Sequence, residues 1–226
     1  LIVHWISKMF HIFTFFSADA PPLLQNSAMD IFFAGISVDG LRKASTNYTE
    51  KNYCRDWKGI ECISNKISHI EFTAYDHGNF GIYFLPHSVT FLWITFSRQK
   101  FVIHTRMLPR NVARLALNHN LISGNPDLST LPHTLIVANL MNNCMSGKID
   151  LTHLPPMMEE LALSKNLFSQ RIVWYDNLPL NIRKIRLHEA SDKQFGNKVR
   201  EVRAVDPERK VDDRWIFEGI AAWKVH

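Results

Sequence analysis

The chain has 226 residues, of which 46% are hydrophobic, and 26 lysines and arginines against 21 aspartates and glutamates give it a net charge of +5. This length suits one domain, or a small domain with tails. The positive excess is modest and no block of five or more basic residues occurs, so composition gives no indication of nucleic-acid binding.

Residues 1–20 have the pattern of a secretory signal peptide. Lys8 precedes a short apolar stretch that ends at Phe16, and Ala18 and Ala20 form a small-x-small site. The apolar stretch is shorter than the roughly 20 residues of a membrane span. The alternative is an apolar end from an incorrect gene model, and whether the chain is a fragment or truly starts at Met9 stays open.

Residues 21–66 are expected to form an N-terminal cap. Residues 23–46 favour one or two short helices, interrupted at Gly40. Asn47 begins an N-glycosylation sequon, Asn-Tyr-Thr, in a predicted surface loop. A cysteine pair, Cys54 and Cys62, follows and directly precedes the first repeat.

Residues 67–188 repeat one motif with a period of about 23 residues, which is typical of a solenoid. The motif is L-x-x-L-x-L-x-x-N, and most copies close on a Leu-Pro pair. The copies begin at Ile67, Val89, Val112, Leu135, Met158 and Ile182. The pattern weakens upstream, where Ser97 and Tyr75 stand at the asparagine position.

Each part of the motif has a structural role. The last two apolar positions are two residues apart, so they point to one side of a short strand. Asn120, Asn143 and Asn166 are expected to turn the chain and to satisfy backbone groups in a buried turn. The fold class predicted is an α/β-type repeat solenoid, a right-handed superhelix with a parallel concave sheet and about five to six repeats.

These motifs resemble the leucine-rich repeats of plant-type extracellular proteins. The N-terminal cap of that family reads C-x-W-x-G-V-x-C, and this chain matches it with one extra residue between Cys54 and Trp57. The segment 143–149 resembles N-x-L-S-G-x-I-P, with Asp150 in place of the proline. The resemblance implies a disulfide between Cys54 and Cys62, although both would be free thiols in a reducing compartment.

No motif of enzymatic chemistry is found. The sequence lacks phosphate-binding, dinucleotide-binding, nucleophile-elbow and zinc-protease patterns. None of its 11 histidines are paired at i, i+2 or i, i+4, the spacings that would suggest a metal site. We expect no catalytic activity, cofactor or metal. Residues 189–226 are predicted to be a non-repetitive C-terminal cap or tail.

Strand side chains that point away from the core are expected to line the concave face in three columns, one of which contains Thr95, Asn118 and Ser164. Phe91 and Trp93 lie on one strand and are candidate interface anchors; alternatively, a loop or the N-terminal segment covers them. The predicted partner-binding residues are Phe91, Trp93, Arg114, Asn139, Met141, Glu160, Lys184 and Arg186.

The sequence therefore predicts a non-enzymatic binding protein, secreted or at the cell surface, that recognises a protein or peptide through its concave face. We expect a monomer that does not bind nucleic acid and contacts a membrane only as part of a longer receptor. The alternatives are a cytoplasmic scaffold or regulatory subunit, and an ectodomain fragment of a receptor kinase.

Overall fold

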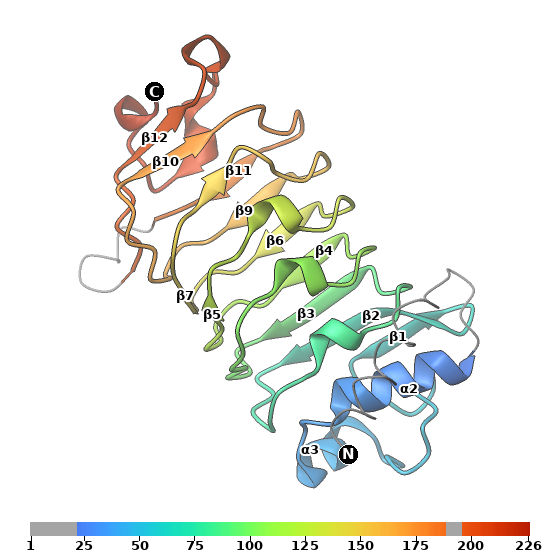
Figure 1. Cartoon of the computed structure of the whole chain (residues 1–226). Coiled ribbons are helices and arrows are strands. Elements are labelled where there is room, and N and C mark those ends of the chain that lie inside the picture. The colour runs from blue at the N-terminus through green and yellow to red at the C-terminus, as the bar shows by residue number, and fades with distance from the viewer. Residues whose placement is uncertain (1–21, 189–195) are drawn as a thin grey trace, which may run out of the picture.

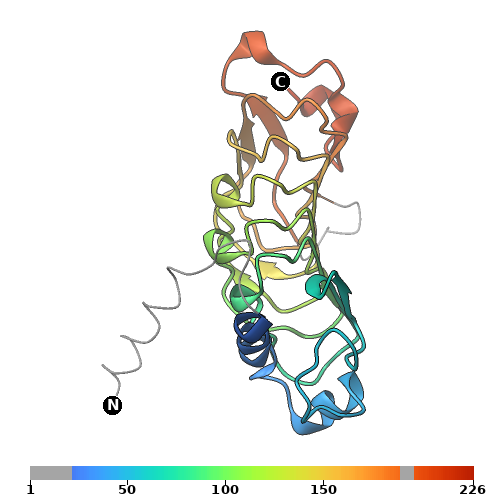
Figure 2. The ribbon, with the colours of Figure 1, turned by 90° about the vertical axis from the view of Figure 1, so that its right-hand side faces the viewer.

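The computed structural model describes residues 22–188 and 196–226. They form an elongated stack of coils, with the N-terminal helices at one end and the C-terminal segment at the other (Figure 1). A view turned by 90° shows the coils following one another along a single axis (Figure 2). The expected signal peptide, residues 1–20, lies outside the described residues.

One eight-stranded sheet runs the length of the stack, in the order β1-β2-β3-β4-β6-β9-β11-β13. The hairpin β1–β2 is antiparallel and the later pairs are parallel. From β2 to β11, neighbouring strands come from successive copies of the repeat, as in a solenoid. The strands are β1 Ile60–Ile63, β2 Lys66–Thr73, β3 Phe91–Thr95, β4 Arg114–Ala116, β6 Val137–Asn139, β9 Glu160–Ala162, β11 Lys184–Arg186 and β13 Phe217–Glu218.

The core is one continuous row of apolar side chains behind this sheet. Leu92, Leu115, Ala138, Leu161 and Ile185 are in register from strand to strand and are all buried. Each coil therefore covers the apolar side of its neighbour, which removes surface from water without a globular core. The predicted solenoid with a parallel sheet is confirmed.

Short strands and 3₁₀ turns complete the coils. The short strands form a two-stranded sheet, β5-β7, and a three-stranded sheet, β12-β10-β8. The strands are β5 Ser123–Gly124, β7 Cys144–Met145, β8 Asp150–Leu151, β10 Ile172–Tyr175 and β12 Glu201–Ala204. The turns are η1 Ile82–Phe84, η2 Thr105–Met107, η3 Leu128–Thr130, η4 Pro207–Arg209, η5 Arg214–Ile216 and η6 Ala222–Lys224.

The motif asparagines are buried and link one coil to the next. Asn143 is representative: its Nδ2 donates to the carbonyl of Leu117 in the preceding coil at 2.9 Å and to that of Leu140 in its own coil at 3.2 Å. Its Oδ1 accepts from the backbone N–H of Ile122 at 3.0 Å. Asn120 and Asn166 make equivalent bonds. One side chain thus satisfies backbone groups on two coils.

In the irregular early repeats, other side chains replace this amide. Ser97, at the asparagine position, donates to the carbonyl of Thr95 at 2.7 Å. Gln99 is fully buried; its Oε1 accepts from the N–H of Phe80 at 2.8 Å and its Nε2 donates to the carbonyl of Gly78 at 2.9 Å. The Ser97 hydroxyl also accepts from the N–H of Tyr75 in the preceding coil at 3.0 Å, so Ser97 and Gln99 together link these two coils.

The coil continues beyond the end of the sequence motif at Leu187. Asn197 is buried, and its Nδ2 donates to the carbonyls of Leu163 at 2.8 Å and Leu187 at 2.7 Å. It thus makes the bonds of the motif asparagines one coil further on. Strand β13 then adds to the concave sheet beside β11, so part of the segment 189–226 extends the solenoid.

Two helices form the N-terminal end, α2 Pro22–Phe33 and α3 Val38–Ala44. Ser37 caps α3 by accepting the N–H of Gly40 at 3.2 Å, as expected for an N-cap serine. Trp57 is buried, with its ring 4.4 Å from that of Phe33 and 4.7 Å from that of Tyr53. These rings pack together at the N-terminal end of the stack.

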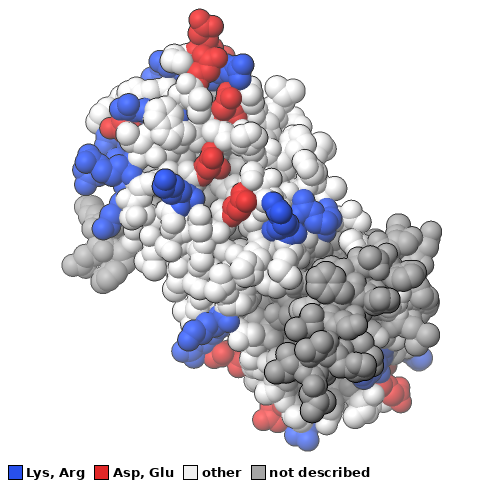
Figure 3. Space-filling view, in the orientation of Figure 1, with Lys and Arg blue, Asp and Glu red and all other residues white. Residues whose placement is uncertain are grey.

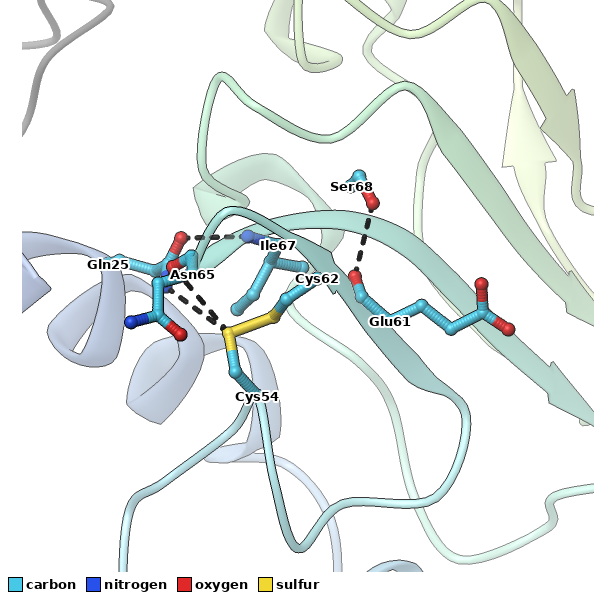
Figure 4. The surroundings of a disulfide bond; sticks show 7 residues. All are labelled: Gln25, Cys54, Glu61, Cys62, Asn65, Ile67 and Ser68. Atoms are coloured by element: carbon cyan, nitrogen blue, oxygen red, sulfur yellow. Dashed lines mark hydrogen bonds between the residues drawn. A yellow bond between two sulfur atoms is a disulfide. The ribbon is translucent and has the colours of Figure 1, made fainter.

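A disulfide joins Cys54 to Cys62, which confirms the pairing that the resemblance implied. Gln25 of α2 lies beside it (Figure 4): its Nε2 donates to the carbonyl of Asn65 at 3.0 Å and its Oε1 accepts from the N–H of Ile67 at 2.9 Å. The helix, the disulfide loop and the first strands are thereby held together at the end of the sheet.

Candidate functional site

The concave sheet carries a hollow of about 280 Å³ between β3 and β11. Buried core residues such as Leu115, Ala138 and Leu161 lie at its floor. Six of the predicted partner-binding residues line it, namely Trp93, Arg114, Asn139, Glu160, Lys184 and Arg186. The repeat brings these residues together because each occupies an outward-facing position of a successive strand.

An aromatic cluster adjoins the N-terminal side of the hollow, where Trp93 is part of the lining and Phe91 and His69 are not. The rings of Phe91 and Trp93 stack with centroids 5.3 Å apart and an interplanar angle of 12°. His69 stacks on the other side of Phe91 at 3.9 Å and 8°. All three side chains are half-buried, so part of each ring stays accessible. Sequence reasoning missed His69 as a member of this aromatic cluster, although its position on the preceding strand was the available signal.

The middle of the hollow carries two charges of opposite sign. Arg114 on β4 and Glu160 on β9 are both exposed, with the half-buried Val137 of β6 between them in register. Within the described part of the chain, neither charged group has an ion-pair partner within 4.0 Å. They are available to a ligand without first breaking an internal contact.

The C-terminal side of the hollow carries two basic residues, Lys184 and Arg186, that share one acidic partner. Glu218 of β13 pairs with Lys184 at 2.9 Å and with Arg186 at 2.7 Å, so one carboxylate of the tail offsets one of these two positive charges. Hydrogen bonds from Lys184 and then Arg186 hold the pKa of the Glu218 carboxyl below its usual range. The tail therefore contributes to the surface, which the sequence motif did not indicate.

Replacing Glu218 with glutamine is expected to lower the stability of the folded protein mainly at neutral pH. Because the folded-state pKa of Glu218 is lowered, the stabilisation by its carboxylate is present above the unfolded-state pKa and is lost as pH falls through the folded-state pKa. Unfolding midpoints of the wild type and of Glu218→Gln should thus differ at pH 7 and converge at an acidic pH below the folded-state pKa of the carboxyl. An equal difference at both pH values would contradict this assignment.

Three members of one expected column do not face the concave surface. Thr95, Asn118 and Ser164 are buried, so the expectation that they line that surface is wrong. At this position the chain already turns toward the buried asparagines, which draws the side chains inward. Met141 belongs to the same column and is half-buried, beyond the end of β6 and outside the hollow. Met141 is therefore a predicted site residue that does not line the hollow.

The remaining sequence-derived sites are accounted for as follows. Asn47 is exposed in a turn after α3 and accepts a hydrogen bond from the Thr49 hydroxyl at 2.9 Å. Among residues 22–188 and 196–226, no group of three or more His, Cys, Asp or Glu side chains could hold a metal ion. The helices of the same ranges lack the length and apolar character of a bilayer span. Over the face drawn in Figure 3, basic and acidic side chains lie interspersed.

Comparison with known proteins supports the fold. No protein-family model matches the chain. No curated protein sequence matches it either. The crystal structure of a pollen receptor kinase 3 superposes with a TM-score of 0.59 over 87% of this chain and 95% of that chain, at 17% identity. A plant ice-binding protein aligns with a TM-score of 0.42 over 79% of each chain, at 12% identity.

The receptor kinase match agrees with the features built up from the sequence. They are the period of about 23 residues, the buried asparagines that join the coils, the parallel sheet of successive copies and the Cys/Trp cap closed by a disulfide. The chain therefore has the leucine-rich repeat fold, and its repeats and cap resemble those of the plant-specific type.

Proposed function

We propose that the chain is a non-enzymatic binding protein that recognises a protein or peptide through its concave face. The observation that carries this proposal is the accessible stack of Phe91 and Trp93 at the edge of the hollow. Aromatic side chains of this kind bury a large area at low cost in conformational entropy and are enriched among interface anchors. The charges of Arg114 and Glu160, which have no ion-pair partner among the described residues, favour a partner with both signs of charge.

The proposal includes an extracellular, monomeric protein. The disulfide between Cys54 and Cys62 supports this location, because such bonds persist in oxidising compartments. The exposed Asn47 supports it as an accessible acceptor for a glycan. A nucleic-acid partner is disfavoured by the acidic Glu160 in the hollow and by the pairing of Glu218 with Lys184 and Arg186.

Replacing Phe91 and Trp93 together with alanine is expected to weaken binding at least about 30-fold, because anchors of this kind contribute about 2 kcal/mol or more. The probe is a phage-displayed library of random 12-residue peptides selected on the immobilised wild type. Affinities of the selected peptides for both proteins are then compared by biolayer interferometry.

A matched control replaces Trp215 and Trp223, which are 80% and 72% exposed in the tail, with alanine. We expect this control to bind the selected peptides like the wild type, and both double variants to keep a cooperative unfolding transition. Unchanged affinity in Phe91→Ala/Trp93→Ala, or equal loss in the tail control, would count against the concave face.

A further inference from the structure

One row of side chains crosses the concave sheet at right angles to the strands. Pairing places its members in register, one from each of six strands: His69, Phe91, Arg114, Val137, Glu160 and Lys184. The row changes character along its length, from aromatic to positive, aliphatic and negative. Its last cation, Lys184, is occupied by Glu218. A ligand lying along the row therefore meets an asymmetric series of groups.

The two unpaired charges determine what such a ligand must carry. A partner that covers Arg114 and Glu160 removes water from both, and a charge that loses water without gaining a counter-charge is costly. The ligand therefore needs an anion opposite Arg114 and a cation opposite Glu160. An apolar group is needed beside the anion, where Phe91 and Trp93 present their rings.

The spacing of the strands limits how the ligand can present these charges. Arg114 and Glu160 are two strands apart, which corresponds to about 10 Å at about 4.8 Å per strand. In a polyproline II peptide, residues three apart lie on one face and are about 9.3 Å apart. In a β-strand, same-face residues are about 6.8 or 13.6 Å apart. The polyproline II spacing is the closer match.

From this we infer that the concave face selects an extended, polyproline II-like peptide with an acidic and a basic side chain three residues apart and an apolar residue next to the acidic one. The inference rests on the proposed function and specifies its partner. Either chain direction of the peptide satisfies it, because the row fixes the order of the groups and not the direction of the peptide backbone.

The test uses the same peptide library and a charge exchange, Arg114→Glu with Glu160→Arg. Peptides selected on the wild type are expected to show the three-residue spacing and to bind the exchanged protein about tenfold more weakly, the combined effect of two exposed charge pairs. Selection on the exchanged protein should yield the basic residue beside the apolar one. Wild-type binding should also weaken as salt is raised.

The matched control exchanges Arg106 and Glu50, which are exposed away from the hollow, and should leave binding unchanged. Selected peptides that need Phe91 and Trp93 but lack the charge pair, place it at another spacing such as seven residues on a helix, or ignore the exchange would overturn this inference and leave the proposed function standing. If no selected peptide depends on Phe91 and Trp93, both are overturned.

Discussion

Replacing Asn143 with alanine is expected to lower the free energy of unfolding by about 3 kcal/mol. The substitution removes the donor to the carbonyls of Leu117 and Leu140 and the acceptor for the N–H of Ile122. These backbone groups belong to two coils and are away from water, and each buried group left without a partner costs about 1–3 kcal/mol. Partial rearrangement of the turn keeps the total near the lower end of their sum.

Guanidinium chloride unfolding under non-reducing conditions measures this effect as a lower midpoint at unchanged slope. Asn181→Ala is the matched control, because Asn181 is an exposed asparagine of the last regular repeat, and surface changes of this kind stay within about 0.5 kcal/mol. Equal midpoints for Asn143→Ala and Asn181→Ala would show that the asparagine links contribute little to the stack.

Replacing Gly59 with alanine is expected to cost about 3 kcal/mol as well, for a different reason. Gly59 has a φ of +78°, a left-handed conformation that costs a residue with a Cβ about 1–2 kcal/mol. An added Cβ would also lie 2.3 Å from the carbonyl oxygen of Glu71. The Glu71 N–H donates to the carbonyl oxygen of Gly59 at 2.8 Å. The backbone at Gly59 therefore cannot move away from Glu71 without breaking this bond at the start of the sheet.

The neighbouring Lys58→Ala serves as the control, since the Lys58 side chain is exposed and its backbone bond to Ala44 is kept. Thermal unfolding of the two variants should give a clearly lower midpoint only for Gly59→Ala. A Gly59→Ala protein as stable as Lys58→Ala would mean that the cap accommodates a methyl group here. Steric crowding would then not explain why the Cys/Trp motif has a glycine at this position.

The regular part of the solenoid could be predicted from the sequence because its contacts are local and periodic. A fixed period places the same motif position of each copy at the same height, so the alignment of Leu92 with Leu115 and Leu161 follows from counting residues. The alternation of the strand likewise placed Trp93, Arg114 and Glu160 on one accessible face. The burial of Asn118 broke this rule, because the turn begins one residue earlier than strand alternation assumes.

Contacts made by residues that lie outside the regular spacing of the motif could not be predicted in this way. Asn197 follows Asn166 by more residues than one period, yet both bind the carbonyl of Leu163. Gln99 replaces an amide that normally comes from another position of the motif. Such replacements depend on the distance between two neighbouring coils in the folded protein. A pattern of residue types along the chain does not give that distance.

The sequence by itself determined the repeat, the register, the cap and the row of outward-facing side chains, since stacking of nearest neighbours requires only a local motif at a constant period. Only the tertiary structure decided which charges of that row remain available. Glu218 joins Lys184 and Arg186 across an interval of more than thirty residues, and leaves Arg114 and Glu160 facing solvent. The physical reason is that electrostatic pairing depends on distance in space. The chain beyond its last regular repeat places β13 beside β11, and so brings Glu218 within reach of Lys184 and Arg186.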